Sequence, residues 1–194
     1  KSDFDNDPVL DRFVVQLQKS EIKTKFSKIP DFTWASTNVD SLLNKYFNKK
    51  FILLFPFCSS QNSHKQWPFF NNLIEIINSN YSNLKIAIVP GPNEINNAKK
   101  INTTTILNNG IPLNVMQLTA VIMKSSYVIS NDTGPAHIAA HLGKSGTVIF
   151  GPHTSAKKVS IETEKFNPIS VNNLNELSAE KLYLSIKAKL DLIN

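Results

Sequence analysis

Residues 127–150, YVISNDTGPAHIAAHLGKSGTVIF, contain two short apolar runs separated by a polar turn and an amphipathic stretch. The runs YVIS (127–130) and TVIF (147–150) are rich in residue types that favour strands. Between them, AHIAAHLG (136–143) has the residue pattern of a helix. A strand, a helix and a second strand of these lengths are typical of a right-handed βαβ unit, whose two strands are parallel.

The same alternation of strand and helix patterns extends toward both ends of the chain. Further strands are predicted at FILLF (51–55), LKIAIV (84–89) and TTTIL (103–107). Further helices are predicted at FFNNLIEIINS (69–79), EINNAKKI (94–101), NVMQLTAVIMKS (114–125) and 178–193, the last with Leu182, Ile186 and Leu190 on one stripe. We therefore predict the α/β class, with a Rossmann-like, mainly parallel sheet that is flanked by helices on both faces.

The first 50 residues have a different pattern. Residues 8–19 place Val9, Phe13 and Leu17 at helical spacing and predict one helix. Residues 20–50 are polar, contain Pro30 and predict a connector with one short strand at Phe32–Trp34. We expect residues 1–50 to lead in from a preceding domain and residues 51–194 to form the Rossmann-like domain.

Composition narrows the function classes. No window of the 194 residues approaches the roughly 18 apolar residues of a membrane helix, and the start KSDFDNDP does not resemble a signal peptide. The one cysteine, Cys58, fits a reducing compartment, so a cytoplasmic location is expected. The net charge of +6 permits a phosphate-bearing or anionic-surface partner without requiring one. All cations except Arg12 are lysines, so nucleic acid is not expected as a partner.

The first polar segment that follows a predicted strand is PFCSSQNSHKQWPFF (56–70). In a parallel sheet, ligands bind beyond the carboxyl ends of the strands. The segment offers Ser59, Ser60, Ser63, His64 and Lys65 ahead of a helix, a combination that suits a phosphate. The alternative is a solvated loop in which Trp67 is only a packing anchor.

The second segment is VPGPNE (89–94), where Glu94 stands near the start of a helix. An acid at this place in a nucleotide-binding fold can accept hydrogen bonds from ribose hydroxyls. A first-turn Glu that is stabilised by the helix dipole explains it at least as well.

The third segment is the turn NDTGP, in which Asp132 or Thr133 can cap the next helix and Gly134 allows a ligand close to the backbone. His137 lies four residues after Thr133, so both can face the strand ends. The free N–H groups of such a turn can bind a diphosphate. Taken alone, the segment is also a good helix start with a structural histidine.

Together these segments resemble the carboxy-terminal, donor-binding domain of glycosyltransferase family 9, which contains the lipopolysaccharide heptosyltransferases. The matching motifs, in the order found in the family, are KQWP (65–68), GPNE (91–94), and SNDTGPAHIAAHLG (130–143) followed by VIFGPHTS (148–155). The longest of these motifs is the most specific, and the lead-in and terminal helices fit the family as well.

The resemblance implies one half of a GT-B fold and a metal-independent, inverting transfer from a nucleotide-diphosphate sugar, usually ADP-heptose, with no cofactor. Ser59 and Ser60 would bind the donor's phosphates, and Lys65 would stabilise the leaving diphosphate. Glu94 would hold ribose or sugar hydroxyls. The sugar-diphosphate end would be held by Asp132, Thr133, Gly134 and His137. The acceptor would be a phosphorylated glycolipid in lipopolysaccharide core assembly, so contact with the inner face of the bacterial inner membrane is expected.

The chain departs from the family pattern in two respects. Its first loop reads PFCSS instead of PGAS, so the phosphate contact is not assigned to one serine. The family's acceptor domain, which carries the catalytic base, precedes the donor domain, and the amino-terminal acids Asp3, Asp5, Asp7 and Asp11 match no such motif. We expect donor binding without efficient turnover, because general-base catalysis typically contributes about 10²–10⁴-fold.

Three other functions remain as alternatives. One is a nucleotide-binding scaffold without transferase activity. Another is a transferase or epimerase that uses a UDP- or GDP-sugar. A metal hydrolase is disfavoured, because His64, His137, His141 and His153 lack compact ligand spacing with a carboxylate.

Overall fold

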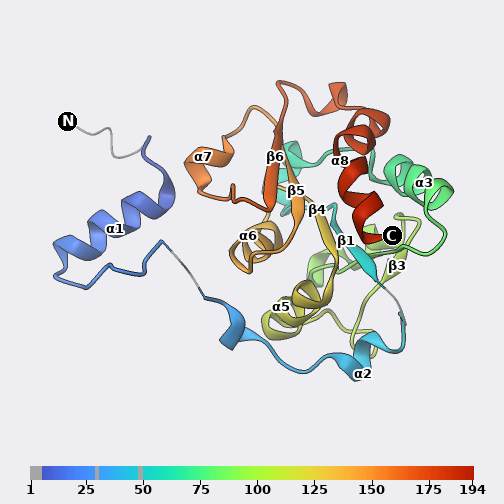
Figure 1. The fold of residues 1–194 in the computed structure, drawn as a ribbon, viewed down its shortest axis with the longest axis horizontal. Coiled ribbons are helices and arrows are strands. Elements are labelled where there is room, and N and C mark those ends of the chain that lie inside the picture. Colours follow the sequence, from blue (N-terminus) through green and yellow to red (C-terminus); the bar gives the residue numbers. More distant parts are fainter. Residues whose placement is uncertain (1–5, 29–30, 48–49) are drawn as a thin grey trace.

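The computed structural model describes residues 6–28, 31–47 and 50–194, so the expectations for Asp3, Asp5 and Pro30 lie outside it. In these ranges six parallel strands form one sheet in the order β3-β2-β1-β4-β5-β6 (Figure 1). The strands are β1 (Phe51–Phe55), β2 (Lys85–Ile88), β3 (Thr104–Thr105), β4 (Tyr127–Asn131), β5 (Gly146–Phe150) and β6 (Phe166–Ser170). The predicted α/β class and Rossmann-like parallel sheet are confirmed.

Strand order places a crevice near the middle of the sheet. β1 pairs with β2 on one side and with β4 on the other, so the chain runs outward from β1 toward β3 and outward from β4 toward β6 in opposite directions. The loops that follow β1 and β4 therefore separate at the carboxyl ends of these strands, which is where ligands bind in open α/β sheets. The expected functional segments at residues 56–70 and 131–135 follow these two strands.

Helices cover both faces of the sheet, because alternate residues of each central strand point to opposite sides. Ile52 and Leu54 pack with the face covered by α3 (Phe70–Asn80) and α8 (Ala179–Ile193). Leu53 packs with the face covered by α5 (Val115–Lys124) and α6 (Gly134–His141). The predicted stripe of α8 is confirmed, since Leu182, Ile186 and Leu190 are buried.

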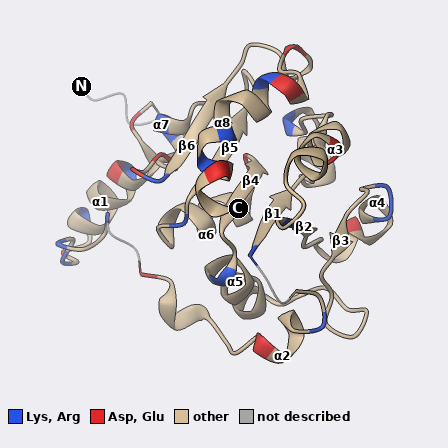
Figure 2. Ribbon diagram, turned by 45° about the vertical axis from the view of Figure 1, so that its right-hand side comes forward, with Lys and Arg blue, Asp and Glu red and all other residues tan. Residues whose placement is uncertain are grey.

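Charged residues are confined mainly to helices and loops (Figure 2). The central strands β1, β4 and β5 contain no Lys, Arg, Asp or Glu and are buried along their whole length. This pattern is typical of a parallel sheet that is covered on both faces.

Some elements differ from the sequence-based predictions. The expected strand at Phe32–Trp34 is wrong, because residues Thr33–Ala35 form a short 3₁₀ helix (η1). The Asp31 carboxylate accepts hydrogen bonds from the backbone N–H and the hydroxyl of Thr33, and such a turn competes with a strand. The helix expected at 94–101 is a 3₁₀ turn (η3, Pro92–Glu94) that continues into the short α4 (Ile95–Ala98).

Two α-helices and one strand were not predicted: α2 (Asp40–Leu43), α7 (Ala156–Val159) and the edge strand β6. The proline at position 168 obscured β6, since proline is tolerated only at sheet edges. β6 pairs with β5 alone among the strands of this sheet.

The helix predicted at residues 8–19 is confirmed as α1 (Val9–Lys19), which lies beside α7 at one side of the molecule (Figure 1). The Leu10 backbone N–H donates to the Ser160 hydroxyl at 3.3 Å, and Asp11 pairs with Lys28. None of the residues of α1 is fully buried. Among the described residues, no helix is long and apolar enough to cross a bilayer.

Candidate functional site

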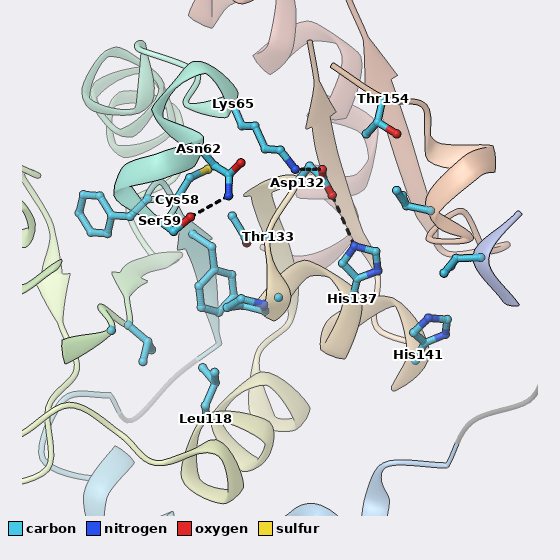
Figure 3. A pocket seen from close by; sticks show the side chains of 18 of the residues that line it. Cys58, Ser59, Asn62, Lys65, Leu118, Asp132, Thr133, His137, His141 and Thr154 are labelled. Atoms are coloured by element: carbon cyan, nitrogen blue, oxygen red, sulfur yellow. Dashed lines mark hydrogen bonds and ion pairs between the residues drawn. The ribbon is translucent and has the colours of Figure 1, made fainter. Parts of the chain in front are cut away.

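A cavity of about 810 Å³ opens at the carboxyl ends of the central strands (Figure 3). Its walls come from the loop after β1, the η3 turn after β2, the start of α6, the segment after β5 and the helix α1. It therefore occupies the place where the strand order predicts a ligand. Seven of the eight predicted site residues line it: Ser59, Lys65, Glu94, Asp132, Thr133, Gly134 and His137.

Asp132 is the centre of the polar contacts at this site. Lys65 Nζ donates to Asp132 Oδ2 at 2.8 Å, and His153 Nε2 lies 3.1 Å from the same oxygen. His137 Nε2 lies 3.4 Å from Oδ1. Only 5% of the Asp132 side chain is exposed, so the aspartate is enclosed by these three side chains and not by water.

The surroundings keep Asp132 ionised. Burial by itself raises the pKa of this carboxyl, but hydrogen bonds from His137, Lys65 and His153 outweigh burial and hold the pKa well below its ordinary value. These contacts join Asp132 to the loop after β1 and to the segment after β5, so the aspartate orders the turn before α6.

His153 was not predicted as a site residue; the sequence offered it only within the motif VIFGPHTS and as a disfavoured metal ligand. It comes three residues after β5, with its side chain 9% exposed and stacked on Phe150 at 6.0 Å between ring centroids. Burial lowers its pKa, although the hydrogen bond with Asp132 opposes that shift. Its position at the end of a predicted strand, beside the other site segments, was the available signal.

A buried asparagine holds the Lys65 loop in place. Asn131 Nδ2 donates to the carbonyl of Pro56 at 2.8 Å, and its Oδ1 accepts from the backbone N–H of Trp67 at 3.0 Å. Trp67 Nε1 also donates to the carbonyl of Leu177 at 2.7 Å. Trp67 is thus a packing anchor, as the alternative for this segment held, while the same loop carries Lys65 to the site.

The serines of this loop differ in position. Ser59 lines the cavity, and its hydroxyl accepts from Asn62 Nδ2 at 2.7 Å. Ser60 begins the 3₁₀ helix η2 (Ser60–Lys65), is exposed and is not among the lining residues. Asn62 lines the cavity and was not predicted.

The start of α6 is open to the cavity. Thr133 takes the N-cap position, but its side chain makes no capping hydrogen bond and instead lies 3.2 Å from the Ser130 hydroxyl. The expected side-chain cap from Asp132 or Thr133 is therefore wrong. A Cβ placed on Gly134 would meet no atom within 4 Å, so the backbone here faces free space.

Glu94 is engaged with its own turn. Its Oε2 accepts from the backbone N–H of Gly91 at 2.7 Å, which agrees with the helix-start alternative, and the residue also lines the cavity. Its second carboxylate oxygen leaves capacity for further hydrogen bonds.

Other chemistries are limited by the side chains present. Burial raises the pKa of the Cys58 thiol to about 12, so this cavity residue is a neutral thiol and not a nucleophile. Within residues 6–28, 31–47 and 50–194, no three His, Cys, Asp or Glu side chains are arranged to hold a metal ion.

Comparisons with known proteins agree with this architecture. A family model described as glycosyltransferase family 9 (heptosyltransferase) matches residues 3–184. No curated protein matches the chain.

Solved structures with a similar fold include two from E. coli. Heptosyltransferase WaaC with ADP has a TM-score of 0.63 and 19% identity, over 76% of this chain and 47% of that chain. ADP-heptose lps heptosyltransferase II has a TM-score of 0.64 and 14% identity, over 76% of this chain and 49% of that chain.

A third similar structure, S. aureus MnaA with UDP, has a TM-score of 0.60 and 18% identity, over 94% of this chain and 49% of that chain. The chain thus spans about half the length of these proteins, and its sheet resembles one half of a GT-B glycosyltransferase.

Proposed function

The chain belongs to glycosyltransferase family 9, and from this membership we propose that residues 51–194 bind the nucleotide-diphosphate sugar donor, with ADP-heptose as the expected donor. The observation that carries the proposal is the convergence of Lys65 and Asp132 at the open start of α6. A cation, an ordered turn and free helix N–H groups around one cavity suit a diphosphate. The solved structure of WaaC contains ADP, and that of MnaA contains UDP.

The order of the strands suggests how the donor lies. Apolar residues after β2 and around the start of α5 line one end of the cavity, which suits a nucleobase: Val89, Pro90, Leu113 and Leu118. Glu94 at this end would accept a hydrogen bond from a ribose hydroxyl. The diphosphate would lie between Ser59, Lys65 and the N–H groups after Thr133, and the sugar would reach His137.

The chemical role of this arrangement is leaving-group stabilisation. An inverting transfer leaves negative charge on the diphosphate as its bond to the sugar breaks. Preorganised N–H groups and the Lys65 ammonium stabilise that charge where it develops. A lysine has three protons to donate, so Lys65 can contact the diphosphate while it keeps its bond to Asp132.

A general base for the acceptor hydroxyl is not proposed among the cavity acids. Asp132 is enclosed by three cationic or hydrogen-bonding side chains, and Glu94 closes its own turn. We propose that an additional acceptor-binding region supplies the base, and that the acceptor is a phosphorylated glycolipid of lipopolysaccharide core or a related glycan. This chain alone would bind donor with little turnover.

A UDP-sugar is the second candidate donor. It is favoured by the likeness to MnaA with UDP, which extends over 94% of this chain. The two candidates share the diphosphate site and differ only in the nucleobase end of the cavity.

Calorimetric titration with ADP, UDP and GDP tests the proposal. We expect ADP to bind with a Kd of about 10⁻⁵ to 10⁻³ M, which is typical of a half-site, and more tightly than the other two. Lys65→Met should weaken the binding by about tenfold or more, because a charge-assisted contact is lost. Lys99→Met, which removes an exposed lysine outside the cavity, is the matched control and should bind as the wild type does.

The outcomes separate the candidates. Tighter binding of UDP would replace the ADP-sugar by a UDP-sugar. If no nucleotide bound, or if Lys65→Met bound ADP as tightly as the wild type, the donor-site proposal would be wrong and a scaffold role would be favoured.

A further inference from the structure

The cavity has a basic end that the donor site does not use. Arg12 of α1, His141 of α6 and Lys158 of α7 line it on the side toward α1. No Asp or Glu from the described residues lines this end, because the two acids of the cavity, Asp132 and Glu94, follow β4 and β2. Burial lowers the pKa of His141, so the positive charge of this end comes from Arg12 and Lys158, which suit a ligand group of opposite charge.

Arg12 is the residue that suggests a bound ligand. It is the one arginine of the chain, and its Nε is buried without a hydrogen-bond partner among the described residues. It forms no ion pair with any described residue. The neighbouring acid, Asp11, is paired with Lys28 instead. An unpaired donor of this kind costs free energy unless a group beyond the described residues accepts its hydrogen bond.

The position of Arg12 beside Lys158 is set by the packing of α1 on α7. The hydrogen bond from the Leu10 N–H to the Ser160 hydroxyl joins the residue two before Arg12 to the residue two after Lys158. Both cations therefore belong to one wall of the cavity. An arginine can hold a phosphate with two parallel N–H bonds, while a lysine adds a point charge.

This wall is displaced from the proposed diphosphate site. Lys65 and Asp132 follow β1 and β4, whereas α7 follows β5, the next strand outward. Figure 3 shows Thr154 and His141 on the opposite side of Asp132 from Cys58 and Ser59. The segment after β5 also carries His153 to Asp132, so the two regions adjoin, and a cavity of about 810 Å³ has room for two separate anionic groups.

We propose that Arg12 and Lys158 form a second anion subsite, which takes a phosphate monoester on the acceptor sugar. The assignment of this phosphate to the acceptor rests on the proposed donor site, because the donor's own diphosphate is assigned to Lys65 and the start of α6. The lead-in helix α1 thereby becomes part of the substrate site.

The test compares two probes, ADP and a hexose 6-phosphate, in separate calorimetric or NMR titrations, with the unphosphorylated hexose as a blank. Arg12→Gln should weaken hexose 6-phosphate binding by about tenfold and change ADP binding by less than about twofold. Arg12→Lys should recover part of the affinity. Lys19→Gln is the matched control, since it removes one exposed charge from the last turn of α1 outside the cavity.

Each remaining outcome overturns the subsite. If Arg12→Gln lost ADP affinity by tenfold, Arg12 would belong to the donor's diphosphate. If the wild type bound hexose 6-phosphate no better than hexose, or no better than Arg12→Gln does, no acceptor phosphate would be held there. Thermal melting checks that each variant is folded. A wild type that failed to bind ADP would count against the donor site, whereas the comparison with hexose 6-phosphate would still be decisive for Arg12.

Discussion

Lys65 Nζ and Asp132 Oδ2, which belong to residues 67 positions apart, lie 2.8 Å from each other and join the loop after β1 to the turn before α6. The lysine side chain is 23% exposed and the aspartate 5%, so the pair is shielded from water on the aspartate side. Asp132 thereby fixes the lysine at the edge of the cavity. An arriving diphosphate would meet an ammonium group that is already in place.

The first prediction concerns the pH dependence of stability. Because the pKa of Asp132 is lower in the folded chain than in the unfolded chain, its stabilising effect is complete above the unfolded value of about 4 and is lost as the pH falls toward the folded value. Asp132→Asn should reduce the free energy of unfolding by about 1–3 kcal/mol at pH 7. Urea unfolding should show this difference shrinking below about pH 4.

The control for this prediction is Asp40→Asn. Asp40 forms an exposed ion pair with Lys124, in which both side chains are more than half exposed (56% and 57%). Such a pair contributes about 0–1 kcal/mol, so its removal should have a small effect at each pH. A difference between wild type and Asp132→Asn that stayed constant down to pH 3 would contradict the prediction.

The second prediction concerns the protonation of His153. Burial lowers the pKa of His153. Its Nε2 is bonded to the Asp132 carboxylate, which can only accept, whereas its Nδ1 has no hydrogen-bond partner among the described residues. At about pH 6.5, where a free histidine is half protonated, His153 should be mostly neutral with its proton on Nε2. Long-range ¹H–¹⁵N correlation spectra report this tautomer directly.

The same shift affects stability. Since the unfolded chain takes up a proton at a higher pH than folded His153 does, the stabilising effect is complete above about pH 6.5 and falls as the pH drops toward the folded value. In Asp132→Asn the preference for the Nε2 proton should weaken. The finding that both ring nitrogens of the wild type carry protons at pH 6.5 would refute the assignment.

The third prediction concerns Asn131, which is fully buried and bonded to the backbone of Pro56 and Trp67. Asn131→Leu leaves a carbonyl and an N–H unpaired in the interior, at a cost of about 1–3 kcal/mol for each group. Denaturant unfolding should show this loss, and ADP binding should weaken because the Lys65 loop is released.

Asn78→Ala is the matched control for Asn131→Leu. Asn78 is exposed on α3, so the change should alter the free energy of unfolding by less than about 0.5 kcal/mol. If Asn131→Leu were as stable as this control, the two hydrogen bonds would not hold the loop.

The fourth prediction compares two glycines. A Cβ on Gly146 would lie 2.6 Å from the carbonyl oxygen of Val128 and 2.3 Å from the Phe166 ring, so Gly146→Ala should destabilise the fold by about 1–3 kcal/mol. A Cβ on Gly134 would meet nothing within 4 Å. Gly134→Ala should therefore melt near the wild-type temperature but bind ADP several-fold more weakly, because the methyl group enters the ligand space. Unchanged ADP affinity in this variant would show that the ligand does not approach Gly134.

Much of the fold could be predicted because its signals are local. The runs at 51–55, 127–130 and 147–150 are short and mainly apolar, and each is separated from the next helix by a polar turn. The sequence-based predictions were wrong where a local side-chain hydrogen bond replaced a strand, or where a strand at the sheet edge contained a proline. The Asp31 carboxylate turned an expected strand into η1, and Pro168 concealed the edge strand β6.

The sequence by itself determined the α/β class, the family resemblance and the edge of the sheet where the polar loops meet. The reason is that the spacing of apolar residues and the turn residues specify local structure over short stretches of chain. Only the tertiary structure decided that His153 joins Lys65 and His137 around Asp132, that Glu94 turns back to Gly91, and that Arg12 faces the cavity. These contacts depend on strand order and side-chain direction. Spacing along the chain does not specify either of these when the partners come from different loops.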